Sequence, residues 1–330
     1  MNRPVENRSR PTALAAVLAL IGAALLGLTA CATTGAQRPG VVVTTNILGD
    51  ITREIVGDQA EVTVLMGPGA DPHSFGVSAP QAARIEQADL IVHNGLGLEE
   101  NVLRHVEAAR ESGVAALAVG EGVDPLTYAS DDTAGRPDPH FWTDPVRVRT
   151  AVRLIADELI EHVEGVDATV VRANAARYDA RLSDLSAWMR NRFAAIPDDR
   201  RNLVTDHHVF GYLAQRFGFR VIGAVIPSGT TLASPSASDL TSLATAIERA
   251  KVPAIFADSS RPDRLAQALR RESHLDVRVL SLFSESLTER GGGAATYLEM
   301  MRANTTAIAD GLGAPTPTAR PTAGTERKTP

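Results

Sequence analysis

Three of the eight histidines in this chain stand where a loop leaves a predicted β-strand. His73 and His140 each end an Asp-Pro-His tripeptide, and His207 comes just after a predicted strand. A carboxylate, Glu285, stands in the equivalent place after the last predicted strand. Imidazole and carboxylate are good ligands for divalent transition metals. Because open α/β sheets bind ligands at the carboxyl ends of their strands, these four side chains are candidates for one shared ion.

The Asp-Pro-His tripeptide occurs at residues 71–73 and again at 138–140. Proline fixes its own φ and biases the preceding residue toward extended geometry, so the approach to each histidine is stiff. The neighbouring aspartate could accept the second imidazole N–H and fix the tautomer. The four candidates are nevertheless far apart in the sequence and form no compact motif such as a zinc finger. Spacing alone therefore leaves an ordinary structural role open for each histidine.

Short β-branched and apolar runs alternate with helical stretches along the chain, four on each side of a helical middle. This alternation predicts an α/β fold of two similar lobes, each a mainly parallel sheet with flanking helices. The predicted strands are Val41–Asn46, Glu61–Met66, Asp89–Asn94, Ala115–Val119, Asn202–Thr205, Arg220–Val225, Ala254–Ala257 and Arg278–Leu282.

The middle of the chain predicts one long helix. No proline falls between Pro145 and Pro197, and Gly165 is the only glycine there. Apolar residues recur every three or four positions from Val171 to Phe193, which is the period of one continuous helical stripe. The helix could pack on the surface of one lobe or join the two lobes rigidly. We favour the second interpretation because the helix falls between two complete sets of strands.

The N-terminus predicts a secretory signal, with a basic start, an apolar run over 13–28 and small residues before Cys31. The ending Leu-Thr-Ala-Cys at 28–31 resembles a bacterial lipobox, in which the cysteine is acylated and becomes the first mature residue. An ordinary cleaved signal is the alternative. Cys31 is the only cysteine, so the mature protein has no disulfide and no thiolate ligand. We therefore expect a lipid anchor on the extracytoplasmic face of the cell membrane.

The composition argues against nucleic-acid binding, because the formal charge is −6 and only 4% of residues are aromatic. We expect a monomer that meets the membrane by its lipid anchor only. The predicted divisions are a lipoprotein signal peptide (1–30), a tether (31–39), an N-terminal metal-binding lobe (40–166), a linking helix (167–197), a C-terminal metal-binding lobe (198–313) and a disordered tail (314–330).

Ordered motifs along the chain resemble the metal-specific solute-binding proteins of ABC importers, the cluster A-I family of zinc and manganese receptors. The similarity runs from about residue 41 to residue 312. The motifs that carry it are Gly67–Phe75, Ala88–Glu99, Asp138–Pro145, Thr205–Tyr212, Leu282–Leu287 and Tyr297–Asn304.

The resemblance implies two pseudo-symmetric lobes linked by a backbone helix, with one metal ion between them. In the family the histidine of each Asp-Pro-His motif is a ligand, so His73 and His140 inherit that role. The third family ligand falls on His207. The fourth, usually aspartate, falls on Glu285, so here the chain departs from the commoner pattern. Gly76 also replaces an acidic residue that often follows the first histidine motif.

Three other residues compete for roles at this site. His208 is adjacent to His207, and the matching register leaves it as a gating or surface residue. Asp258 follows a predicted strand and is an alternative to Glu285 as the fourth metal ligand. Otherwise it orients one of the ligands without contacting the metal itself. His93 stands at a strand end and is expected to pack in the core.

Three imidazoles and one carboxylate suit tetrahedral Zn²⁺, whereas Mn²⁺ prefers more oxygen ligands. Zinc is therefore favoured and manganese is the alternative, although residues 120–137 lack the histidine run of many zinc-specific relatives. The resemblance implies a non-enzymatic receptor that delivers its ion to an ABC transporter permease. A secreted zinc-dependent hydrolase and a surface adhesin remain alternatives.

Overall fold

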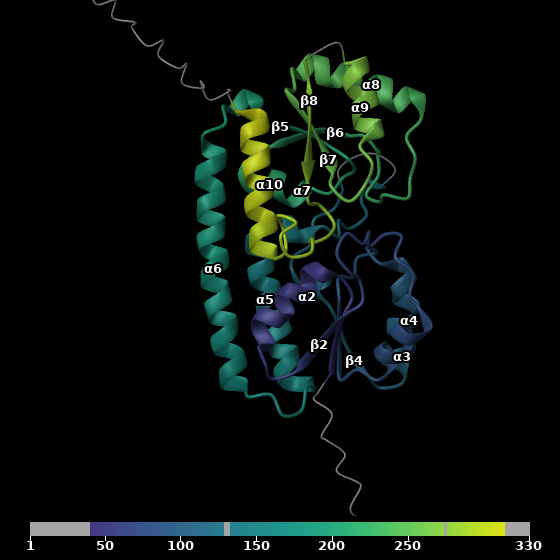
Figure 1. The fold of residues 1–330 in the computed structure, drawn as a ribbon, viewed down its shortest axis with the longest axis vertical. Helices are drawn as coiled ribbons and strands as arrows, with labels where there is room; N and C mark the ends of the chain where they lie inside the picture. Colours follow the sequence, from purple (N-terminus) through teal and green to yellow (C-terminus); the bar gives the residue numbers. More distant parts are fainter. Residues whose placement is uncertain (1–39, 129–132, 274–275, 314–330) are drawn as a thin grey trace, which may run out of the picture. The chain divides into compact units, whose positions relative to one another are not determined.

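The computed structural model describes residues 40–128, 133–273 and 276–313, which form two four-stranded sheets flanked by helices (Figure 1). The strand orders are β2-β1-β3-β4 and β6-β5-β7-β8, and every neighbouring pair is parallel. The two sheets therefore repeat one topology, each as the centre of one lobe. The predicted fold class is confirmed.

The N-terminal lobe is a sheet between two layers of helices. In β1, Val42 packs toward the α3–α4 side, whereas Val41 and Val43 pack toward α2, α5 and α6. Side chains alternate between the faces of a strand, so a run of valines is buried on both sides. The elements are β1 Gly40–Val43, α2 Asn46–Val56, β2 Glu61–Val64, α3 Ala79–Glu86, β3 Leu90–His93, α4 Glu100–Glu111, β4 Ala115–Ala118, η1 Val119–Gly122, η3 Phe141–Thr143 and α5 Pro145–His162.

The C-terminal lobe repeats this arrangement. In β7, Ile255 packs toward α8 and α9, whereas Phe256 packs into the larger core beside α10. The elements are η4 Asp198–Arg200, β5 Asn202–Thr205, α7 Gly211–Phe217, β6 Arg220–Ala224, α8 Ala237–Ala250, β7 Ala254–Asp258, α9 Arg264–Glu272, β8 Arg278–Leu282 and α10 Tyr297–Leu312.

Helix α6, Ala168–Ala194, runs alongside helices of both lobes (Figure 1). It begins at the N-cap Asp167, whose side chain accepts from the amide of Thr169. Its predicted apolar stripe is buried in the largest core, which also holds residues of α2, α5 and α10. Ion pairs join it to α2 (Arg181 to Glu54), to α5 (Asp179 to Arg149) and to α10 (Arg192 to Asp310). A single helix thus joins the lobes, as the sequence predicts.

The first predicted strand, Val41–Asn46, ends early, at Val43. Thr45 is the N-cap of α2, and its hydroxyl accepts from the amide of Leu48 at 3.3 Å. A threonine in this position terminates the strand because its side chain satisfies a helix amide that has no intrahelical partner. Asn46 consequently begins a helix, and its side chain turns toward the C-terminal lobe.

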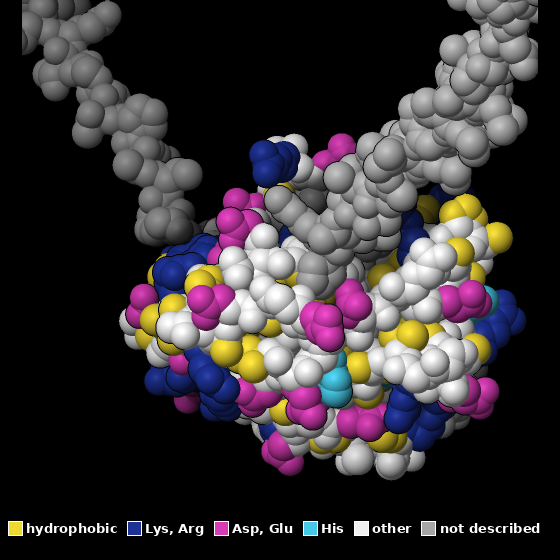
Figure 2. Space-filling model, turned by 90° about the horizontal axis from the view of Figure 1, so that it is seen from below, with side chains coloured by type: hydrophobic (Ala, Val, Ile, Leu, Met, Phe, Trp, Pro, Cys, Tyr) yellow, Lys and Arg dark blue, Asp and Glu magenta, His cyan; other side chains and the backbone are white. Residues whose placement is uncertain are grey.

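Among the described residues, no helix is long and apolar enough to span a bilayer. The predicted signal peptide, Cys31, the tether and the tail lie outside the described residues. Figure 2 shows that acidic and basic side chains are interspersed over the described part of one face.

Candidate metal centre

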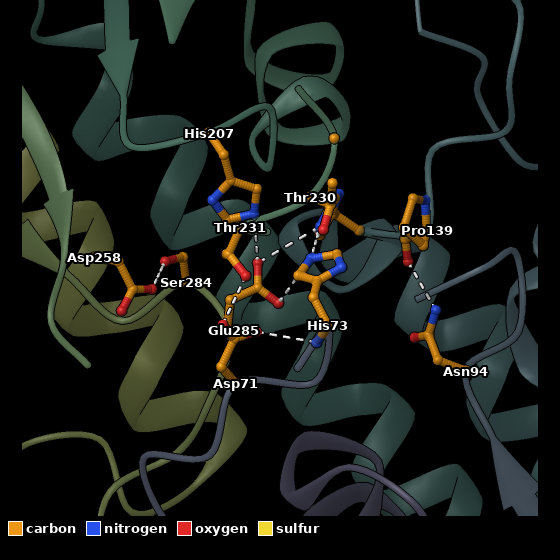
Figure 3. A network of polar contacts seen from close by, with 12 residues as sticks. Asp71, His73, Asn94, Pro139, His207, Thr230, Thr231, Asp258, Ser284 and Glu285 are labelled. Atoms are coloured by element: carbon orange, nitrogen blue, oxygen red, sulfur yellow. Dashed lines mark hydrogen bonds and ion pairs between the residues drawn. The ribbon is translucent and has the colours of Figure 1, made fainter. Parts of the chain in front are cut away.

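The four candidate ligands predicted from the sequence come together between the two sheets. The loops after β2 and β4 carry His73 and His140, and the loops after β5 and β8 carry His207 and Glu285. One ligand atom from each side chain lies within 4.8 Å of the other three, and all four residues are buried. Figure 3 shows His73, His207 and Glu285 converging from different loops. Parallel strands bring this about, since their carboxyl ends share one edge of each sheet.

Several distances between donor atoms are close to those around a small tetrahedral ion. His140 Nε2 lies 3.4 Å from His73 Nε2 and 3.5 Å from Glu285 Oε1. Glu285 also approaches the other two histidines, with Oε1 2.9 Å from His207 Nε2 and Oε2 4.0 Å from His73 Nε2. Ligands about 2.0–2.1 Å from a tetrahedral Zn²⁺ are separated from one another by about 3.3 Å.

Several of these donor atoms have no hydrogen-bond partner among the described residues. Both ring nitrogens of His207 and both carboxylate oxygens of Glu285 are buried and unpartnered. His207 Nε2 and Glu285 Oε1 are within ion-pair distance, but they are not aligned as a hydrogen bond. Buried polar atoms without partners are costly, and a divalent cation would supply a partner to His207 Nε2 and to the Glu285 carboxylate at once. The side chains therefore fit a metal ion.

The Asp138 carboxylate orients the imidazole ring of His140. Its Oδ1 accepts from the backbone amide of His140 at 2.9 Å and lies 2.8 Å from the imidazole Nδ1. A carboxylate at Nδ1 fixes the tautomer that leaves Nε2 free to bind a metal. This contact matches the role expected of the aspartate in the second Asp-Pro-His tripeptide.

Asp258, the alternative to Glu285, lies behind the cluster rather than in it. Its carboxylate is buried and accepts hydrogen bonds from the hydroxyl of Ser260 and from that of Ser284, the second of which is drawn in Figure 3. Ser284 directly precedes Glu285, and its carbonyl also accepts from the indole N–H of Trp142 at 2.9 Å. Asp258 and Trp142 therefore fix the loop that presents Glu285.

The other two histidines under comparison also lie apart from the four. The ring of His208 is directed toward Tyr128, with 6.4 Å between the ring centroids. His93 is buried in the N-terminal lobe, and burial lowers its pKa to about 4. Among the described residues, neither joins the group of potential ligands, which favours His207 over His208 and a packing role for His93.

The sequence profile of the family described as Zinc-uptake complex component A periplasmic (ZnuA) matches residues 41–311. The chain belongs to this family.

Relatives in the ZnuA family are similar over nearly their whole length. Metal ABC transporter substrate-binding lipoprotein FimA of Streptococcus parasanguinis is 32% identical, over 91% of this chain and 98% of FimA. Zinc-binding protein TroA of Treponema pallidum is 31% identical, over 83% of this chain and 89% of TroA. Manganese ABC transporter substrate-binding lipoprotein PsaA of Streptococcus pneumoniae is 29% identical, over 91% and 98%. The solved structure of periplasmic TroA matches with a TM-score of 0.76 and 29% identity, covering 84% of this chain and all of that one.

The charges within this ZnuA-family site are unevenly distributed. Burial lowers the pKa of His73 and holds that of His140 well below its ordinary value. Burial acts in the same direction on His207, but the carboxylates of Asp206 and Glu285 outweigh it and raise the pKa of His207 to about 10. Burial works to raise the pKa of Glu285, but the adjacent histidines hold it below its ordinary value. Without a metal, the site therefore holds two neutral imidazoles and one imidazolium–carboxylate pair.

The sequence analysis did not identify Asn46, which fastens the loop of Glu285 from the opposite lobe. Its Oδ1 accepts from the amide of Leu287 at 2.9 Å, and its Nδ2 donates to Ser286 Oγ at 2.8 Å. The same Nδ2 also lies 3.2 Å from the carbonyl oxygen of Gly67, in the loop that leads to His73. No spacing signal marks this residue, because its partners are far along the chain.

Proposed function

We propose that this protein is an extracytoplasmic receptor that captures one divalent transition metal ion and delivers it to an ABC transporter permease. The observation that carries the proposal is the convergence of four buried donor groups, several of them without other partners. His73, His140, His207 and Glu285 would be the ligands. The N-terminal and C-terminal lobes (40–166 and 198–313) would each supply two, and the segment 167–197 would link the lobes.

The arrangement of donors favours a carrier over a catalyst. Four protein ligands complete a tetrahedral shell, whereas catalytic zinc keeps one position open for water or substrate. All four side chains are buried, with His140 and His207 0% exposed. A hydrolase would need an open position and a nearby general base. We therefore assign no enzymatic activity to the site.

We favour Zn²⁺ as the ion, with Mn²⁺ as the alternative. Three imidazole nitrogens and one carboxylate form a nitrogen-rich set that suits zinc, whereas manganese prefers oxygen ligands. The relatives include both a zinc-binding protein and a manganese receptor. The names of the relatives do not decide between the two ions, so our choice of zinc rests on the three imidazoles and one carboxylate of this chain.

The cellular setting is inferred from the N-terminus and from the names of the relatives. Acylation of Cys31 would anchor the chain in the cytoplasmic membrane with its lobes on the extracytoplasmic side. Relatives are named as lipoproteins of ABC transporters, which supports both the anchor and a permease partner. We expect the receptor to act as a monomer.

Elemental analysis of purified protein spanning residues 32–330 tests the proposal. After incubation with Zn²⁺ and removal of loose metal, we expect one zinc per chain. His73→Ala and Glu285→Ala should each reduce the bound zinc well below one. His162→Ala is the control, because this histidine is exposed on α5 and should leave the stoichiometry unchanged. Equal zinc content in all four proteins would refute the assignment of the ligands.

A further inference from the structure

The Asp71 carboxylate accepts hydrogen bonds from residues of both lobes. Its Oδ1 accepts from the backbone amide of His73 at 3.0 Å, within the N-terminal lobe. Its Oδ2 accepts from the hydroxyl of Thr231 at 2.6 Å, and Thr231 belongs to the loop after β6 in the C-terminal lobe. Figure 3 shows Asp71 joined by dashed lines to both Thr231 and His73. One side chain therefore joins the turn that carries a candidate ligand to the opposite lobe.

Arg261, in the loop after β7, completes the contact. Its Nη1 donates to the carbonyl oxygen of Thr231 at 2.9 Å and lies 3.7 Å from Asp71 Oδ2. Thr231 is 3% exposed, whereas the Arg261 side chain is 34% exposed. We call Asp71, Thr231 and Arg261 the interlobe clasp. Its central hydrogen bond is partly buried, with the Asp71 side chain 19% exposed, and its outer edge is a charged side chain in partial contact with solvent.

The loop that carries Thr231 also covers the approach to His73. Thr230 and Leu232 line a pocket of about 140 Å³ that reaches His73. The loop packs closely there, since a Cβ on Gly229 would clash with the hydroxyl oxygen of Tyr128. A side chain at position 229 would therefore displace Tyr128. The interlobe clasp thus holds a closely packed loop across the opening of the site.

The two Asp-Pro-His tripeptides differ in what their aspartates contact. Asp138 directs its carboxylate to the imidazole of its own tripeptide, at 2.8 Å from Nδ1. Asp71, like Asp138, accepts from the backbone amide of its own histidine, but its second oxygen accepts from Thr231 of the opposite lobe. The same three residues therefore orient a ring in one loop and bridge the lobes in the other.

We propose that Thr231 and Arg261 are positioning residues that hold His73 in place through Asp71 and thereby set the residence time of the ion. This inference rests on the proposed function, since it concerns the same site. An ion that contacts both lobes can leave only when the ligand loops of one lobe move away from those of the other, and such a movement breaks the clasp. A contact made only in the closed state raises the closed population and so slows release. Capture of the metal ion begins from the open state, in which the hydrogen bonds of the interlobe clasp are not formed.

The test measures the rates of Zn²⁺ binding and release separately. Stopped-flow release into excess chromogenic chelator gives the dissociation rate, and direct mixing with Zn²⁺ gives the association rate. Thr231→Val keeps the side-chain volume but removes the hydroxyl from a charged partner. Its dissociation rate should rise by about ten- to a hundred-fold, with the association rate changed less than about two-fold. Arg261→Ala should act in the same direction but more weakly, because its guanidinium is partly solvated.

Matched variants separate positioning from a general loss of structure. Thr231→Ser retains the hydroxyl and should restore slow release. Arg264→Ala removes an exposed arginine three residues beyond Arg261 and should leave both rates unchanged. The metal-free forms of all variants should have the same thermal unfolding midpoint within a few degrees. If Thr231→Val fails to fold, the dissociation rate of Arg261→Ala decides the test.

Unchanged dissociation rates in both Thr231→Val and Arg261→Ala would overturn the inference, as would a slowed association rate with release unaffected. Failure of the proposed function looks different, because the unaltered protein would then bind no zinc in either experiment.

Discussion

Zinc binding near pH 8 should release about one proton from the protein. In the metal-free site, burial lowers the pKa values of His73 and His140, so both imidazoles are already neutral. Burial also works to lower the pKa of His207, but Asp206 and Glu285 raise it to about 10. A metal can bind an imidazole nitrogen only after its proton has left. The proton displaced at pH 8 is therefore the one on His207.

The magnitude follows from that pKa. A competing proton weakens the apparent affinity about ten-fold for each pH unit below the pKa of the ligand, or about 1.4 kcal/mol per unit. The apparent affinity for Zn²⁺ should thus rise about a hundred-fold from pH 7 to pH 9 and level off above pH 10. Histidines with an ordinary pKa near 6.5 would give a flat profile above about pH 7.5. At lower pH the slope should steepen as His73 and His140 also take protons.

The assay is a competition between the protein and a chelator whose own pH dependence is known. Calorimetry in two buffers of different ionisation enthalpy counts the released protons independently. Asp206→Asn removes one of the two carboxylates beside His207, so its affinity should rise less steeply between pH 7 and pH 9. His162→Ala should match the unaltered protein. A flat profile from pH 7.5 to pH 9, with no proton released, would refute the reasoning.

Three further predictions concern residues outside the four candidate ligands. Asp138→Asn should weaken zinc binding by about ten- to a hundred-fold in the same competition assay, because it removes the carboxylate that orients His140. Phe193→Ala should reduce the free energy of unfolding by about 3–5 kcal/mol in urea, since this ring is buried at 1% exposure, whereas the exposed Arg190→Ala should have little effect. Burial raises the pKa of Glu99 to about 7 from an ordinary 4.5, so ionisation destabilises the fold as pH rises through that interval. Glu99→Gln should therefore gain stability relative to the unaltered protein, by about 3 kcal/mol at pH 8 and almost nothing at pH 4; an equal difference at both pH values would contradict the assignment.

Much of the fold could be predicted from local patterns. Each predicted strand has an observed counterpart, because β-branched runs buried on both faces are a strong local signal. The stripe from Val171 to Phe193 predicted the helix that the structure shows as α6, Ala168–Ala194. The predicted strand end at Asn46 was wrong, because the observed end at Val43 depends on Thr45 acting as a helix cap, which periodicity does not report.

The candidate site was predictable only in part. Topology places the ends of parallel strands together, so His73, His140, His207 and Glu285 could be grouped without coordinates. Asn46 and Thr231 could not, because their partners lie in the other lobe and the residues themselves carry no distinguishing pattern. The two Asp-Pro-His tripeptides likewise look alike in the sequence, although one orients an imidazole and the other bridges the lobes.

The central claim is that four side chains from both lobes bind one ion. Anomalous diffraction at the zinc absorption edge, from crystals of the zinc-loaded protein, tests it most directly. One strong anomalous peak should lie about 2.0–2.1 Å from His73 Nε2, His140 Nε2, His207 Nε2 and a carboxylate oxygen of Glu285. A peak elsewhere on the protein, with these four side chains contacting no metal, would contradict it.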